Sequence, residues 1–170
     1  MAKVCVVMGS DSDLKVMSSC LEALEKFQIP FEVRISSAHR LPEETAELAR
    51  SAASRGVKVF IAGAGAAAHL AGVIAALTTL PVIAVPLSGS ALEGLDALYA
   101  TVQMPKGIPV ATVAVDGAFN AGVLAAQILA LHDPELSSKL VHYKKELASQ
   151  VKEKNRRLQE LGYRAYLEQS

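Results

Sequence analysis

Five short strand-like runs alternate along this chain with longer stretches of helical character, and this alternation is what most constrains the fold. The runs cover residues 3–8, 31–36, 57–62, 82–86 and 110–115. Uninterrupted apolar runs are typical of strands buried on both faces, and a helix between two of them can return the chain to a parallel neighbour. The sequence therefore predicts an α/β fold with a parallel sheet, helices on both faces and right-handed connections.

Composition indicates one domain with a sizeable core. The chain has 170 residues, of which 51% are hydrophobic, so we expect a single domain over 1–170. We expect its core to end at about residue 131 and a helical extension to cover about 134–170. The 17 basic and 17 acidic residues balance, which gives no argument for nucleic acid or an anionic membrane as a partner. Cys5 and Cys20 lack the spacing of a metal site or redox pair and are interpreted as buried thiols.

Two helices and the cellular location can also be predicted. A proline and two glutamates begin the predicted helix 42–55, and arginines precede the glycine that ends it. A longer helix over about 134–158 has one apolar stripe, which packs either on its own sheet or on another subunit.

We expect a cytoplasmic protein, because a strand-like run starts close to Met1 and no apolar run is long enough to cross a bilayer.

The first strand-like run ends at a glycine and continues into small polar residues, Gly9-Ser10-Asp11-Ser12-Asp13. Glycine lets backbone approach a ligand closely, and the free N–H groups at a helix start attract anions. Ser10 can also cap the following helix, with Asp13 as its capping-box partner. Phosphate binding and simple capping are equally good interpretations of this turn.

A histidine and an arginine follow the second run, in Ser37-Ala38-His39-Arg40. Histidine exchanges a proton near neutral pH, and arginine presents a planar fork that suits phosphate or carboxylate. In sheets of this kind ligands bind beyond the carboxyl ends of the strands, so the loops after all five runs should converge on the site. A lone loop histidine is more often a surface residue, but the position of His39 beside Arg40 favours a functional role.

The third run leads into residues 63–70, Gly-Ala-Gly-Ala-Ala-Ala-His-Leu, a second turn of small residues. It lacks the third glycine and the acidic residue of a dinucleotide-binding turn, so a Rossmann cofactor site is a weak interpretation. For His69 a hydrogen bond to backbone is a better interpretation than direct catalysis, although contact with a ligand is realistic. No cluster of His, Cys or carboxylates has metal-ligand spacing.

Together these stretches resemble the PurE family of purine biosynthesis. The resemblance rests on residues 8–13, 37–40, 61–70, 78–86 and 102–107, which follow the family's order. It implies a flavodoxin-like three-layer αβα sandwich with a five-stranded parallel sheet and a long C-terminal helix. It also implies a homo-octamer whose terminal helix reaches a neighbour, and no metal or organic cofactor.

The resemblance further implies an isomerase that acts on a small aminoimidazole ribonucleotide. Members of the type that residues 92–107 resemble convert 5-carboxyaminoimidazole ribonucleotide to its 4-carboxy isomer in IMP biosynthesis. His39 matches the family's proton-transferring histidine, and Ser10, Asp13 and Arg40 match its substrate-binding residues. We expect their neighbours to line the same substrate site, namely Gly9, Ser12, Ser37, Ala38, Gly65, His69 and Leu70.

Two other functions stay open at this point. The second family type carboxylates the unsubstituted ribonucleotide with free carbon dioxide, and a non-enzymatic module that binds FMN or accepts a phosphate is a remote alternative. The chain departs from the family's usual pattern at Ala66, Ala71, Ala84 and 116–119, and we expect added bulk near the pocket there. We expect Ala66 to keep a negative φ, which would shift its turn if the usual glycine serves for positive φ.

Overall fold

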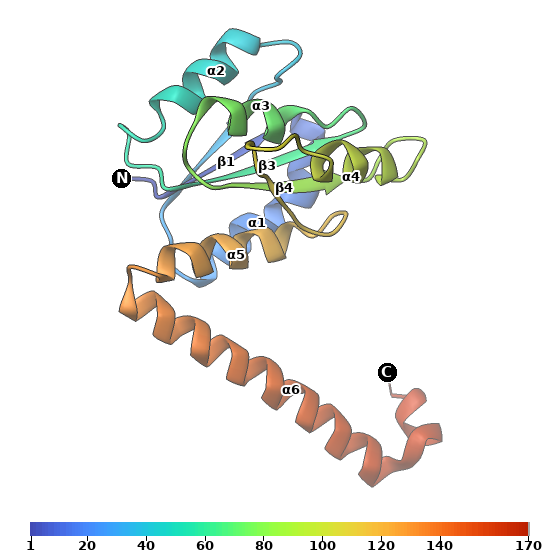
Figure 1. Cartoon of the computed structure of the whole chain (residues 1–170). Helices are drawn as coiled ribbons and strands as arrows, with labels where there is room; N and C mark the ends of the chain where they lie inside the picture. The colour runs from blue at the N-terminus through green and yellow to red at the C-terminus, as the bar shows by residue number, and fades with distance from the viewer. Residues whose placement is uncertain (170) are drawn as a thin grey trace. The chain divides into compact units, whose positions relative to one another are not determined.

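The computed structural model describes residues 1–169, which form two compact units, Met1–Leu129 and a second from Ala130 onward. In the first unit, five parallel strands form one sheet in the order β2-β1-β3-β4-β5 (Figure 1). The strands are β1 Val4–Met8, β2 Phe31–Ile35, β3 Val59–Gly65, β4 Val82–Leu87 and β5 Ala111–Thr112. The predicted α/β fold with a parallel sheet is confirmed, and this strand order is the flavodoxin-like one.

Helices cover both faces of the sheet. They are η1 Asp11–Asp13, α1 Leu14–Lys26, α2 Pro42–Ser51, α3 Leu70–Leu77, α4 Leu95–Val102, α5 Ala118–Ala130 and α6 Pro134–Leu167. Figure 1 shows α2 and α3 on one face and α1 and α5 on the other. The close approach of α1 and α5 depends on Gly122, since a Cβ there would lie 2.7 Å from the Cβ of Ala23. Small side chains therefore let these helices pack closely.

The core lies around the central strands. Every residue of β1 is buried, whereas β2 at the edge of the sheet is only partly covered. Cys5 and Cys20 are free and buried, as predicted, and burial raises the pKa of each thiol to about 12. Because their pKa values are raised, both thiols stay protonated and unreactive at neutral pH.

Several boundaries differ from the predicted ones. β3 runs on to Gly65 because its last residues pair with Pro86 and Leu87 of β4. β5 is only two residues long, since it is an edge strand with a single neighbour. α2 ends at Ser51, and the four residues after it form turns that lead to Gly56 at φ 93°.

The second unit is dominated by α6, which begins at Pro134 as predicted and extends beyond the predicted 158 to Leu167. Asp133 caps its first turn by accepting a hydrogen bond from the N–H of Leu136. The backbone of Gly162 is not helical, at φ 72° and ψ 156°, so the helix is interrupted there. No helix within residues 1–169 combines the length and apolarity needed to cross a bilayer.

Candidate active site

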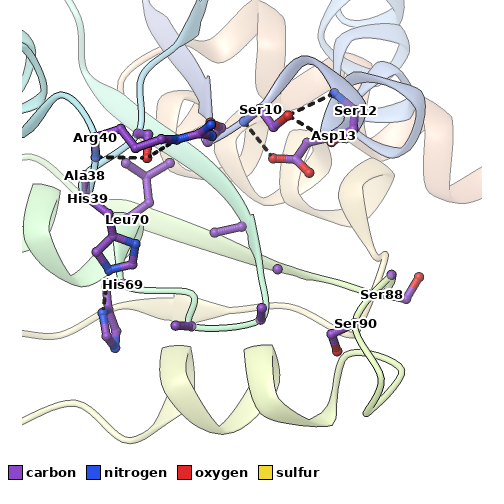
Figure 2. A pocket seen from close by; sticks show the side chains of 17 residues that line it. Ser10, Ser12, Asp13, Ala38, His39, Arg40, His69, Leu70, Ser88 and Ser90 are labelled. Atoms are coloured by element: carbon purple, nitrogen blue, oxygen red, sulfur yellow. Dashed lines mark hydrogen bonds between the residues drawn. The ribbon is translucent and has the colours of Figure 1, made fainter.

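A pocket of about 670 Å³ opens beyond the carboxyl ends of the strands, in the region of β1 and β3 (Figure 2). The chain changes direction across the sheet between these two strands, and this is where open parallel sheets bind ligands. The loops after β1, β2, β3 and β4 supply the lining, which comprises Gly9, Ser10, Ser12, Asp13, Ser37, Ala38, His39, Arg40, Ala64, Gly65, Ala66, Ala67, His69, Leu70, Ser88, Gly89 and Ser90.

All the residues that the sequence assigned to the site lie in this lining. The loop after the fourth run was expected at the site and does line the pocket, but its residues Ser88-Gly89-Ser90 were not among those assigned to the site from the sequence. Within the described chain, the loop after β5 does not line the pocket, so the expectation that every loop would converge there is wrong for this one.

The turn after β1 is both a helix cap and a pocket wall. The N–H of Ser10 donates to Asp13 Oδ2 at 3.0 Å, and the N–H of Ser12 donates to Ser10 Oγ at 3.3 Å. This confirms the predicted capping box. Burial raises the pKa of the Asp13 carboxyl above its usual range, although hydrogen bonds from the backbone of Ser10 and Gly9 act in the opposite direction.

Arg40 bridges two of these loops. Its Nη2 donates to the carbonyl oxygen of Gly9 at 3.1 Å, and its Nε donates to Ser37 Oγ at 3.4 Å. The guanidinium therefore lies beside the turn that follows β1, at the helix start where an anion is favoured. This arrangement can hold a phosphate between a cation and a helix terminus.

Two histidines meet at another part of the pocket. The Nε2 of His39 lies 2.9 Å from the Nδ1 of His69, and the rings are nearly perpendicular at 79° (Figure 2). The interpretation of His69 as a residue bound to backbone is therefore wrong, since its ring contacts His39 instead. One nitrogen must donate and the other accept, so the bond leaves room for only one proton between the rings.

The alanines at which the chain departs from the family's usual pattern do not have the conformation or position expected from the sequence. Ala66 adopts φ 49°, so the prediction of a negative φ is wrong. Ala66 lies directly after β3, which ends at Gly65, in the short connection to α3 at Leu70. Ala71 and Ala84 are buried in the core rather than added to the pocket lining. Among residues 1–169, no three His, Cys, Asp or Glu side chains are placed to hold a metal ion.

Comparison with known proteins gives a consistent assignment. The AIR carboxylase family model matches residues 3–150. A Synechocystis sp. protein named N5-carboxyaminoimidazole ribonucleotide mutase is 54% identical over 164 residues, which is 96% of this chain and 93% of that protein. A Candida glabrata protein named phosphoribosylaminoimidazole carboxylase is 50% identical over 163 residues, which is 96% of this chain but 29% of that protein.

Solved structures agree with this. The crystal structure of Treponema denticola PurE matches with a TM-score of 0.83 and 30% sequence identity, and the match covers 91% of this chain and 97% of that chain. The family model, the relatives and the solved structure thus coincide over nearly the whole chain. The chain belongs to the AIR carboxylase family.

Proposed function

We propose that this chain is an N5-carboxyaminoimidazole ribonucleotide mutase, an isomerase of purine biosynthesis. It moves the carboxylate from the exocyclic nitrogen of the substrate to the adjacent ring carbon. The observation that carries this function is the match over nearly full length to a protein with that name. The carboxylase that uses free carbon dioxide is not favoured, because the relative with the carboxylase name is a much longer protein.

The turn after β1 and Arg40 hold the ribose phosphate in this proposal. Ser10 and Ser12 line the pocket at a helix start, and the Arg40 guanidinium donates to the Gly9 carbonyl oxygen in the same turn. The cation and the helix dipole both favour a dianion there. Gly9, Asp13, Ser37, Ala38, Gly65 and Leu70 complete the contacts with the nucleotide and its ring.

His39 transfers the proton. The carbamate C–N bond breaks, its electron pair returns to nitrogen, and carbon dioxide is released inside the pocket. The ring carbon then attacks the carbon dioxide, and the new C–C bond leaves a proton to be removed. His39 supplies the proton that nitrogen gains and accepts the one that carbon loses, so one imidazole serves both halves. The hydrogen bond to His69 orients the imidazole for this task.

Confinement of carbon dioxide in the pocket also accelerates the reaction in this proposal. Carbon dioxide that stays beside the ring reacts in an intramolecular step, which in favourable cases removes several kcal/mol from the barrier relative to an encounter in solution. A pocket with walls from four separate loops suits this requirement.

We also propose that the enzyme is a cytoplasmic homo-octamer. The exposed apolar side chains of Leu95, Tyr99 and Val102 on α4 support association with further copies. Two free buried thiols are consistent with a reducing compartment.

The mutase proposal is tested by His39→Asn. We expect turnover to be abolished and substrate affinity to stay within about tenfold, because the proton carrier is lost while the phosphate site survives. Steady-state kinetics with the carbamate in bicarbonate-free buffer measure turnover, and calorimetric titration measures substrate affinity. His142→Asn is the matched control, since His142 is an exposed residue of α6. Near-normal turnover in His39→Asn contradicts the assignment.

Arg40→Ala gives the complementary result. It should raise the Michaelis constant more than it lowers kcat, because it removes an anchor that acts before and during the reaction. An unchanged Michaelis constant counts against the phosphate role of Arg40.

If the wild-type enzyme carboxylates the unsubstituted ribonucleotide but does not isomerise the carbamate, the carboxylase function replaces the mutase.

A further inference from the structure

The segment Ser88-Gly89-Ser90 forms part of the pocket wall. Figure 2 shows Ser88 and Ser90 across the pocket from His39 and His69. The segment brings no charged side chain to the pocket. Gly89, at φ 113°, has nothing within 4 Å of a hypothetical Cβ.

Two carboxylates hold this segment from outside the pocket lining. The N–H of Ser88 donates to Asp116 Oδ1 at 2.9 Å, and the Ser88 hydroxyl donates to Asp116 Oδ2 at 2.5 Å. The Ser90 hydroxyl donates to Asp96 Oδ1 at 2.8 Å. Both serine protons are thus engaged away from the substrate, and the segment offers the pocket a fixed shape rather than a charge.

Asp116 lies in a turn with an unusual backbone conformation. Asp116 adopts φ 56°, a conformation that aspartate and asparagine tolerate better than most residues. Its N–H donates to the carbonyl oxygen of Pro86 at 2.9 Å, two residues before Ser88. The same residue therefore binds β4 through its backbone and the following segment through its side chain.

The start of α4 supports the segment from another direction. A Cβ on Gly94 would lie 2.6 Å from Val115 Cγ1 and 3.3 Å from the Cα of Ser88. Gly94 has φ 88°, which also favours glycine. The start of α4, six residues along the chain, and the distant turn at Val115 and Asp116 thus both contact Ser88 and restrict its movement.

We propose that Asp116 is a positioning residue that holds Ser88–Ser90 as a rigid wall, and that this wall retains carbon dioxide between C–N cleavage and C–C bond formation. This inference rests on the proposed mutase function. When the wall is loose, the carbamate carbon still leaves nitrogen and nitrogen still gains a proton. The carbon dioxide then escapes, and the products are the unsubstituted aminoimidazole ribonucleotide and free carbon dioxide.

The test compares Asp116→Gly with Asp116→Asn. Glycine tolerates the positive φ but removes both hydrogen bonds to Ser88. Asparagine keeps both, because its carbonyl oxygen accepts from the Ser88 N–H and its amide donates to the Ser88 hydroxyl. Unlabelled carbamate substrate reacts in buffer with 13C-bicarbonate and carbonic anhydrase, and mass spectrometry measures the label in the product carboxyl. Free aminoimidazole ribonucleotide is measured against decay without enzyme.

We expect Asp116→Gly to raise label incorporation by about fivefold or more, to release unsubstituted ribonucleotide and to lower kcat, with the Michaelis constant within about twofold. Asp116→Asn should match the wild type. Ser88→Ala, which removes only the hydroxyl bond, should give intermediate incorporation and serves if Asp116→Gly does not fold.

The inference is overturned if Asp116→Gly incorporates label and turns over at the wild-type levels. It is also overturned if the variant raises the Michaelis constant without losing carbon dioxide. If Asp116→Gly does not fold, wild-type incorporation in Ser88→Ala overturns it. A wild-type enzyme that does not isomerise the carbamate overturns the proposed function instead, so the two failures are distinguishable.

Discussion

Ala66 shows how a single residue can carry strain at a functional site. It lines the pocket at φ 49°, a region that costs a non-glycine L-residue about 1–2 kcal/mol. The residue is exposed, so its side chain gains little from packing in return. The strain is kept because the chain must turn sharply between β3 and α3 to form this part of the pocket.

Ala66→Gly should therefore stabilise the protein by about 0.5–1 kcal/mol, because the relief of strain exceeds the entropy that glycine gains in the unfolded chain. Urea denaturation monitored by circular dichroism measures the free energy of unfolding. Ala67→Gly is the matched control, since Ala67 is exposed and next in the chain but does not have a positive φ. It should destabilise the protein, and a loss of stability in Ala66→Gly would show that position 66 is not strained.

The chemistry of individual residues was predictable where it is local. Ser10 and Asp13 form their cap within one turn, and His39 and Arg40 lie in the loop that follows β2. The contact between His39 and His69 was not predictable, because the two residues are 30 positions apart and meet only when β2 and β3 both pair with β1. Adjacent residues determine local hydrogen bonds, but they do not determine which distant side chains meet.

At the scale of secondary-structure elements, β2 shows how an edge strand is fastened. Glu32 on β2 accepts hydrogen bonds from Arg55, in the turn after α2, and from Arg34, each at 2.9 Å. The side chain of Glu32 is only 18% exposed. Partial burial alone would raise its pKa, but these hydrogen bonds outweigh burial and hold the pKa of Glu32 below its usual range.

The Glu32 ion pair predicts a pH dependence of stability. A lowered folded-state pKa means that the unfolded chain binds the proton more readily, so the contribution is fully present above the ordinary value of 4.5 and is lost as pH falls through the lowered pKa. Glu32→Gln should cost about 1 kcal/mol at neutral pH and much less near about pH 3. Urea unfolding at both pH values measures this.

The matched control is Glu47→Gln, an exposed glutamate of α2. It should change stability little at either pH. An equal loss of stability in Glu32→Gln at both pH values would mean that packing, and not the ionised carboxylate, is what matters at this position.

Element boundaries were predictable only where they depend on local signals. The start of α2 at Pro42 and the start of α6 at Pro134 agree with the sequence, because proline and a preceding cap act within one turn. The lengths of β3 and β5 were wrong, because a strand extends only as far as a neighbouring strand supplies hydrogen-bond partners.

At the scale of the whole molecule, the proposed octamer makes a prediction about α4. Tyr99 is 59% exposed, so Tyr99→Glu should cost the single chain little but should oppose an apolar contact between copies. Light scattering after gel filtration should give the mass of eight chains for the wild type and a smaller mass for Tyr99→Glu. Glu47→Lys, a charge change on exposed α2, should leave the mass unchanged. A wild-type protein that elutes as a single chain refutes the octamer.

The single-domain prediction and the cytoplasmic location stay predictions, whereas the fold, the family and the isomerase function agree with the comparisons. The sequence by itself determined the parallel sheet, the pocket at its carboxyl edge and the polar residues gathered there, because hydrophobic periodicity and strand ends are properties of neighbouring residues. Only the tertiary structure decided the His39–His69 contact, the positive φ of Ala66 and the tie between Asp116 and Ser88. Each of these depends on where distant segments meet, and packing of the whole sheet sets that position.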